Sequence, residues 1–181
     1  NIININNNDN DIKLYCIKYN NGKICPNPRS AVQMIYYNGK LVLFGGSLGA
    51  LTLTNELWTF NIKFNSWKLE MFERNDVQPN CVGYHSMCKY KKYCVLFGGS
   101  NGWYKNDFIY CNDLYVLNLD ILKWKRINSV NTPSKRCSFG MCVINGYLII
   151  NGGWNGINTL CDTYMVNIND IINDNDVTMS R

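Results

Sequence analysis

The 181-residue sequence predicts an all-β protein made of consecutive β-propeller blades, three of which lie in this chain as a partial propeller. Glycine pairs follow short apolar runs 53 and then 54 residues apart, and a proline precedes each pair by 19 residues. The runs are too short for helices, so this period indicates a repeated sheet. Radial repetition of four-stranded sheets makes a propeller. The glycines are Gly45 and Gly46, Gly98 and Gly99, and Gly152 and Gly153.

The first hairpin of the first repeat is predicted from its turn. Asn38 and Gly39 both tolerate the positive φ that a tight hairpin needs. Residues 29–36 form the strand before this turn, and the apolar run at 40–44 forms the strand after it. The glycine pair ends the second strand, because backbone without side chains allows close approach and unusual φ.

The outer half of the repeat contains two more strands. Residues 56–62 form the third strand, and residues 66–69 around Trp67 form the fourth. The basic stretch at 89–92 aligns with the Asn-Gly turns of the other repeats, so it is predicted as a hairpin tip with solvated lysines.

The repeat divides the chain into six segments. The predicted segments are a low-complexity arm at 1–10, the tail of a preceding blade at 11–25, blades at 26–72, 73–127 and 128–172, and a polar tail at 173–181. The arm is almost entirely Asn, Ile and Asp, which cannot form a core. The third blade is predicted to have an incomplete outer strand, because Asn173 stands where the earlier units have Trp.

Several motifs recur together in these units. Each unit has a proline lead, an apolar strand ended by Gly-Gly, and an acidic residue before a hydrophobic stretch. Arginines follow the proline at Arg29 and Arg136, and a tryptophan closes the unit at Trp67 and Trp124. Over residues 26 to about 168 this pattern resembles the kelch repeats. The resemblance implies structural roles for these residues and for the glycine pairs.

The copies depart from the kelch pattern at three places. Phe60 and Leu117 replace the family's tyrosine, Val82 replaces the second arginine, and the third tryptophan is missing. Three blades cannot close a ring. We therefore expect the remaining blades to come from the same chain, with a second copy as the alternative.

Composition excludes several classes of function. A net charge of +5 is mild, and no basic stripe favours nucleic acid. No apolar run of about 18 residues is present to span a membrane. The nine cysteines show no Cys-x-x-Cys spacing, and several lie in apolar strand runs, so they are interpreted as reduced thiols in a cytoplasmic protein.

The sequence predicts no catalytic residues, no metal site and no cofactor. His85 is the only histidine, so a multi-histidine metal site is excluded. It aligns with Val32 and Phe139 in the first strand of the unit, which favours a structural role over that of a catalytic base. The lone histidine also disfavours a carbohydrate-active propeller. The glycine-rich turns precede no helix that would bind phosphate.

Unequal loops between the second and third strands point to a binding site. The first unit has eight residues there, from Ser47 to Thr54, and the second has twelve, from Ser100 to Cys111. Aromatic rings beside charges are typical of interface anchors. The alternative is that they form a lid over the blade. The predicted partner-binding residues are Trp103, Tyr104, Lys105, Phe108 and Tyr110, flanked by Leu48, Trp154 and Asn155.

The function that the resemblance implies is a non-catalytic protein-interaction module. Its protein partner would bind the loops between the second and third strands. The alternative is a regulatory or targeting segment of a larger enzyme, such as a kelch-linked protein phosphatase, or of a ubiquitin-ligase adaptor. The sequence leaves the partner and the number of blades open.

Overall fold

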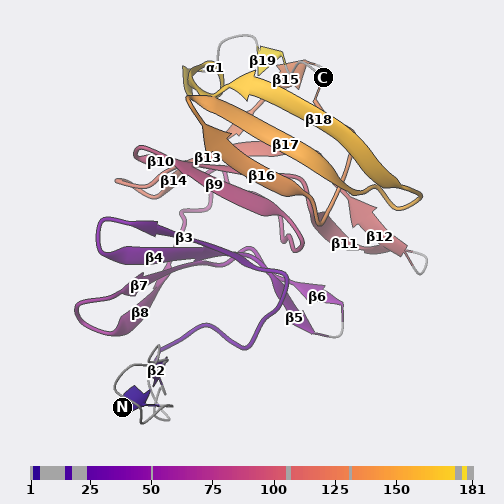
Figure 1. Cartoon of the computed structure of the whole chain (residues 1–181). Helices are drawn as coiled ribbons and strands as arrows, with labels where there is room; N and C mark the ends of the chain where they lie inside the picture. The colour runs from indigo at the N-terminus through magenta and orange to yellow at the C-terminus, as the bar shows by residue number, and fades with distance from the viewer. Residues whose placement is uncertain are drawn as a thin grey trace.

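Three antiparallel sheets follow one another along the chain in the computed structural model (Figure 1). The structure describes residues 2–4, 15–17, 24–49, 51–104, 107–130, 132–173 and 177–178. The sheets are blades 1, 2 and 3, stacked in sequence order with blade 2 in the middle (Figure 1). The all-β prediction is confirmed, and the sheets are those of a partial propeller. The exact blade boundaries stay predictions.

Blade 1 has four strands in sequence order. They are β3 (Gln33–Tyr37), β4 (Lys40–Phe44), β7 (Leu57–Asn61) and β8 (Ser66–Glu70). Asn38 and Gly39 form the predicted turn, with φ of 44° and 75°. The first strand begins later than predicted, at Gln33 instead of residue 29. Ala31 has a φ of 53°, which turns the chain before it becomes extended.

Blade 2 repeats this arrangement. Its strands are β9 (Ser86–Tyr90), β10 (Tyr93–Phe97), β13 (Leu114–Asn118) and β14 (Lys123–Ile127). The predicted hairpin tip is confirmed, since Lys91 lies in the turn between β9 and β10 with a φ of 53°. His85 was predicted inside the first strand, but it lies just before β9. The bend at Tyr84, with a φ of 58°, delays the strand as Ala31 does in blade 1.

Blade 3 has three strands. They are β16 (Gly140–Ile144), β17 (Tyr147–Trp154) and β18 (Thr159–Asn167). Helix α1 (Ile168–Asn173) follows β18 directly, in place of a fourth strand. Ile168 and Ile171 are fully buried in the core shared with blade 2. The chain therefore uses two isoleucines of a helical turn where the other blades use a strand.

Short strands lie outside the three blades. Strand β15 (Ser129–Val130) pairs in parallel with β19 (Val177–Thr178), and β1 (Ile2–Asn4) pairs with β2 (Tyr15–Ile17). Strand β1 lies in the predicted low-complexity arm and β2 in the predicted tail of a preceding blade. Residues 5–14 lie outside the described residues, so both interpretations stay predictions.

The predicted loops between the second and third strands are ribbons. In blade 1, β5 (Ser47–Gly49) pairs with β6 (Thr52–Leu53), and in blade 2, β11 (Ser100–Tyr104) pairs with β12 (Asp107–Tyr110). In blade 3 the same ribbon is the continuation of β17 and β18. All three of these ribbons project from the same end of the stack (Figure 1).

Two apolar cores hold the blades together. Val42 and Phe44 of blade 1 pack with Cys94 and Leu96 of blade 2 in one core, which also contains Trp124. The other core joins blades 2 and 3. The far face of blade 3 differs, because exposed Asn151 stands where blades 1 and 2 have the buried Phe44 and Phe97.

Backbone hydrogen bonds connect the first and second glycine pairs to the next blade. The amide of Gly46 donates to the carbonyl of Val82, and the amide of Gly99 donates to that of Arg136, both at 2.8 Å. A Cβ atom on Gly45 would lie 2.5 Å from the Val82 carbonyl oxygen. These positions require glycine because the neighbouring backbone occupies the place of a side chain.

Candidate binding surface

Five aromatic residues gather where the ribbons of blades 2 and 3 emerge. We call Tyr84, Trp103, Phe108, Tyr110 and Trp154 the aromatic cluster. The rings of Trp103 and Phe108 meet edge to face at 4.6 Å, and Tyr84 meets Phe108 at 5.7 Å. The indole Nε1 of Trp154 donates a hydrogen bond to the Tyr110 hydroxyl at 3.2 Å. The cluster therefore connects two blades at the surface.

The cluster is partly open to solvent. Trp103 is 38% exposed and Trp154 is 39% exposed, whereas Phe108 and Tyr110 are half-buried beside them. Tyr110 lies over the ribbon turn of blade 3, where a Cβ atom on Gly156 would come within 2.7 Å of its ring. The partly exposed indoles of Trp103 and Trp154 are therefore supported by the half-buried rings of Phe108 and Tyr110.

The other predicted binding residues have different settings. Asn155 stabilises the turn of its ribbon, since its Oδ1 accepts hydrogen bonds from the amides of Ile157 and Asn158 at 2.8 and 2.7 Å. Leu48 lies in the blade 1 ribbon, and Tyr104 contributes its backbone to β11. Lys105 lies outside the described residues.

Tyr84 is the member of the cluster that sequence reasoning missed. It comes from the bend before β9, outside the loops between the second and third strands. Its positive φ and the hydrogen bond from its amide to the Ala31 carbonyl, at 3.0 Å, place it near the ribbons. The alignment of Ala31, Tyr84 and Ser138 across the three units was the available signal.

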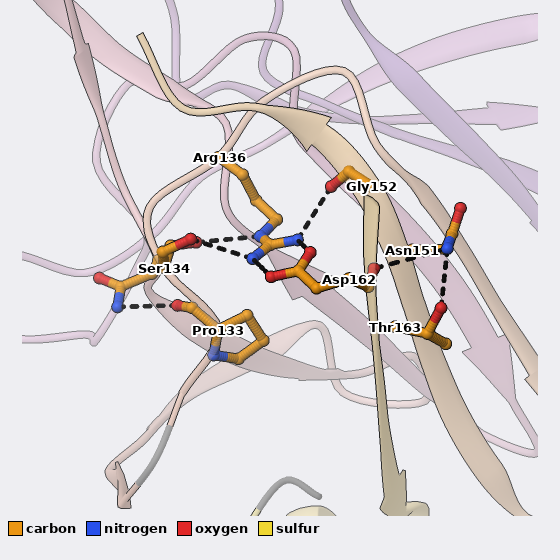
Figure 2. A network of polar contacts seen from close by, with 8 residues as sticks. Pro133, Ser134, Arg136, Asn151, Gly152, Asp162 and Thr163 are labelled. Atoms are coloured by element: carbon orange, nitrogen blue, oxygen red, sulfur yellow. Dashed lines mark hydrogen bonds and ion pairs between the residues drawn. The ribbon is translucent and has the colours of Figure 1, made fainter. Parts of the chain in front are cut away.

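The two motif arginines are buried at the inner corners of blades 1 and 3. Figure 2 shows Arg136 between Gly152, Ser134 and Asp162. Its Nη1 donates to the Gly152 carbonyl at 2.9 Å and to Asp162 Oδ1 at 2.6 Å, and its Nη2 donates to Asp162 Oδ2 at 3.0 Å. The guanidinium is fully buried, so its charge depends on this bidentate pair.

Arg29 makes the matching contacts in blade 1. It donates to the Gly45 carbonyl at 3.1 Å and to Glu56 Oε2 at 2.7 Å. Burial alone raises the pKa of Glu56, but hydrogen bonds from Trp58 and Arg29 outweigh it, so the pKa lies below its usual value. Each arginine therefore links the first glycine of a pair to the acidic residue before the third strand.

His85 lies in an apolar setting. It is 3% exposed, neither ring nitrogen has a hydrogen-bond partner among the described residues, and its ring meets Phe44 edge-on at 6.0 Å. Burial lowers the pKa of His85 to about 4. A general base needs an accessible nitrogen within reach of a substrate proton, and this imidazole has none.

Among the described residues, the thiols and acidic groups do not gather into a reactive centre. The eight cysteines whose side chains the structure describes are free, and burial raises the pKa of Cys88 and Cys111 to about 12. Such thiols stay protonated and unreactive near neutral pH. Within the described ranges, no three His, Cys, Asp or Glu side chains are placed to hold a metal ion. No helix in that part of the chain is long and apolar enough to cross a membrane.

The fold and the repeat together define a propeller segment whose exposed ribbons are its most distinctive surface. Comparison with known families agrees with this class, since residues 6–172 match the model of the KLHDC2/KLHL20/DRC7 Kelch-repeats domain. The match covers most of the chain. The chain therefore belongs to the kelch-repeat family, whose domains are generally non-catalytic and generally bind proteins.

A curated relative adds a wider context. The chain is 28% identical over 148 residues to a probable serine/threonine-protein kinase of Dictyostelium discoideum. The aligned part is 78% of this chain but only 10% of that protein. The chain thus spans about a tenth of the length of this relative.

Proposed function

We propose that this chain is a non-catalytic protein-interaction module whose partner docks on the ribbon end, with the aromatic cluster at the centre. The observation that carries the proposal is a pair of large, partly exposed indoles, Trp103 and Trp154, held on neighbouring blades. The partner is a protein. The free thiols suit the reducing environment of the cytoplasm, which we propose as the compartment.

The physics of the cluster supports an anchoring role. Tryptophan and tyrosine bury a large area while losing few rotatable bonds, which makes them frequent interface anchors. Trp103 is braced by Phe108, and Trp154 is braced by the hydroxyl of Tyr110. Because these contacts exist before binding, little side-chain entropy remains to be lost when a partner docks.

The alternative that the rings form a lid has less support. The two apolar cores that join the blades contain neither Trp103 nor Phe108 nor Tyr110. The rings contact one another above the blade instead. In a lid, these rings would contact the core residues of the blade instead of one another.

A second candidate function is a regulatory or targeting segment of a larger protein. The observation that favours it is the similarity to a small part of the probable Dictyostelium kinase. In that setting the ribbon end would position a substrate or regulator for a catalytic domain. The binding chemistry of the aromatic cluster is the same in both cases.

The test is partner capture by a double variant. Trp103→Ala with Trp154→Ala should reduce quantitative capture of specific binders at least ten-fold, while the thermal midpoint changes by a few degrees at most. Phe64→Ala is the matched control, because Phe64 is an exposed ring that lies in the β7–β8 turn, away from the cluster. Unchanged capture with a collapsed midpoint would establish the lid instead.

A further inference from the structure

The two ends of the stack carry different structures. The ribbons project from one end, and the turns that close the hairpins lie at the opposite end because neighbouring strands are antiparallel (Figure 1). We call this opposite surface the turn end. Its tips are residues 38–39 and 62–65 of blade 1, 91–92 and 119–122 of blade 2, and 145–146 of blade 3. The proposed function uses the ribbon end and leaves the turn end without a role.

The turn end carries many lysines. Six of them lie in the tips or within two residues of a tip, and all six are exposed: Lys40, Lys63, Lys89, Lys91, Lys92 and Lys123. They come from four different turns of blades 1 and 2. In the sequence these lysines are scattered, so only the fold brings them to one end of the molecule.

Among the described residues, carboxylates are scarce at this end. Asp120 lies in a tip, where it accepts a hydrogen bond from the Tyr37 hydroxyl at 2.6 Å, and Asp170 lies in helix α1. Lys123 pairs with Asp76 at 3.2 Å. The acidic residues that precede the third strands belong to the ribbon end, and they are Glu56, Asp113 and Asp162. The positive charge of the described residues is therefore concentrated at the turn end.

Large apolar side chains stand among these lysines. Four of them, at or beside the tips, are between 50% and 70% exposed: Ile62, Phe64, Ile121 and Ile144. Ile62 and Phe64 flank Lys63 in one turn, and the Lys63 ammonium lies 5.6 Å from the centroid of the Phe64 ring. Side chains exposed to this degree gain free energy when they leave water. The turn end therefore combines positive charge with apolar groups that remain to be buried.

Two features favour a lipid surface over a protein or a nucleic acid. The basic residues of the tips are all lysines, whereas protein interfaces are enriched in arginine and depleted of lysine. Attraction to anionic lipids needs only point charges near the surface. The apolar side chains also stand singly beside lysines. That arrangement suits the boundary of headgroups and acyl chains, where an apolar group inserts while the neighbouring ammonium stays among the headgroups.

We propose that the turn end docks on an anionic membrane surface. The lysines lie against the headgroup phosphates and carboxylates, and the apolar tips, chiefly Ile62, Phe64 and Ile121, insert below them. The membrane is bound peripherally and is not crossed. The inference goes beyond the proposed function, because it assigns the opposite end of the stack. In this orientation the ribbon end faces away from the membrane, where it is open to the protein partner.

The experiment measures how the full chain sediments with vesicles. We expect it to bind phosphatidylcholine vesicles that contain about 30% phosphatidylserine at least ten-fold more tightly than pure phosphatidylcholine vesicles. The difference should largely disappear at high salt, where charges are screened over a shorter distance. Equal binding to the two kinds of vesicle would overturn the proposal, as would binding to neither.

A matched pair of double variants locates the charge contact. Lys91→Gln with Lys92→Gln removes two lysines of the turn end and should weaken binding to the anionic vesicles at least ten-fold. Lys125→Gln with Lys135→Gln removes the same charge from exposed positions outside the tips and should have a much smaller effect. Equal losses in the two variants would mean that net charge, and not the turn end, controls binding.

Phe64→Trp reports whether an apolar tip enters the lipid. Phe64 is 70% exposed, so an indole at this position should fold without strain. Compared with the wild type, its additional fluorescence should shift to the blue when anionic vesicles are added, because the ring leaves water. An additional signal that does not move would contradict insertion of this turn and overturn the proposal.

An acidic protein or a nucleic acid is the alternative occupant of a basic surface. Poly-glutamate and duplex DNA are therefore tested with the same wild-type chain and the same lysine variants. If either polymer binds through Lys91 and Lys92 while anionic vesicles do not bind, the surface recognises that polymer and the membrane proposal fails.

The two proposals fail separately, because capture is measured without lipid and vesicle binding without a partner. Phe64→Ala therefore remains a valid control for capture. If the chain captures its partner but binds no anionic vesicles, this inference fails alone. If vesicles bind but the double tryptophan variant captures at the wild-type level, the proposed function fails alone.

Discussion

The inner corners of blades 2 and 3 have the same backbone and different contents. The glycine pairs adopt nearly the same conformation, with φ of 63° and 97° in blade 2 and of 64° and 107° in blade 3. Blade 3 fills the corner with the buried Arg136–Asp162 pair, whereas blade 2 has Val82 at the arginine position. The backbone bonds and apolar cores therefore build a blade, and the ion pair is an addition.

Trp124→Ala should have one of the two largest effects, because blade 2 lacks the ion pair and depends on packing instead. Trp124 is 6% exposed and its ring meets Phe44 at 4.9 Å and Tyr115 at 6.3 Å. We expect a loss of about 3–5 kcal/mol in the free energy of unfolding, measured by chemical denaturation. Trp124→Phe is the control and should cost less, since it retains a ring and removes an indole N–H that has no partner among the described residues.

Arg136→Met tests the other side of the comparison. It removes the bidentate partner of the Asp162 carboxylate, which is 10% exposed, and breaking a buried pair in this way costs about 3–5 kcal/mol. Arg29→Met should cost clearly less, because Glu56 is 33% exposed and keeps the hydrogen bond from the Trp58 indole. Equal losses in denaturation would show that the burial of the carboxylate does not control the cost.

His85→Phe should change how stability depends on pH. The folded pKa of about 4 lies below the unfolded value of 6.5, so between these values only the unfolded chain gains a proton. Stability is therefore lost as pH falls from 6.5 towards 4, by up to about 3 kcal/mol. Phenylalanine fits, since Phe139 packs against Gly98 in the next unit as His85 packs against Gly45.

The readout is the slope of unfolding free energy against pH between 6.5 and 5. In this window the carboxylates contribute little, so the variant should be nearly flat where the wild type declines. A decline of the same size in His85→Phe would mean that another group is responsible.

Local chemistry made the hairpins and most strands predictable. Asn38 and Gly39 favour positive φ whatever surrounds them, and the apolar run at 40–44 needs burial on both faces. The start of the first strand was misplaced because Ala31 and Tyr84 have positive φ without being glycine. Bonds between the blades hold these residues in that conformation, so the residues themselves carry no signal for it.

The candidate site was predictable in composition but not in arrangement. The ribbon aromatics were found because a longer loop with several rings is visible in the sequence. Tyr84 was missed, and the hydrogen bond from Trp154 to Tyr110 joins residues 44 positions apart. Asn155 was assigned to binding, although its side chain accepts two backbone hydrogen bonds in its own turn.

The sequence by itself determined the repeat, the glycine pairs and the family, because period, turn chemistry and apolar runs are properties of consecutive residues. Only the tertiary structure decided what fills each corner and which rings meet at the surface. These depend on residues of different strands and blades brought together by packing. The absence of an arginine at Val82 is visible in the sequence, but the pairing of Asp113 with the exposed Arg126 exists only once the strands have come together.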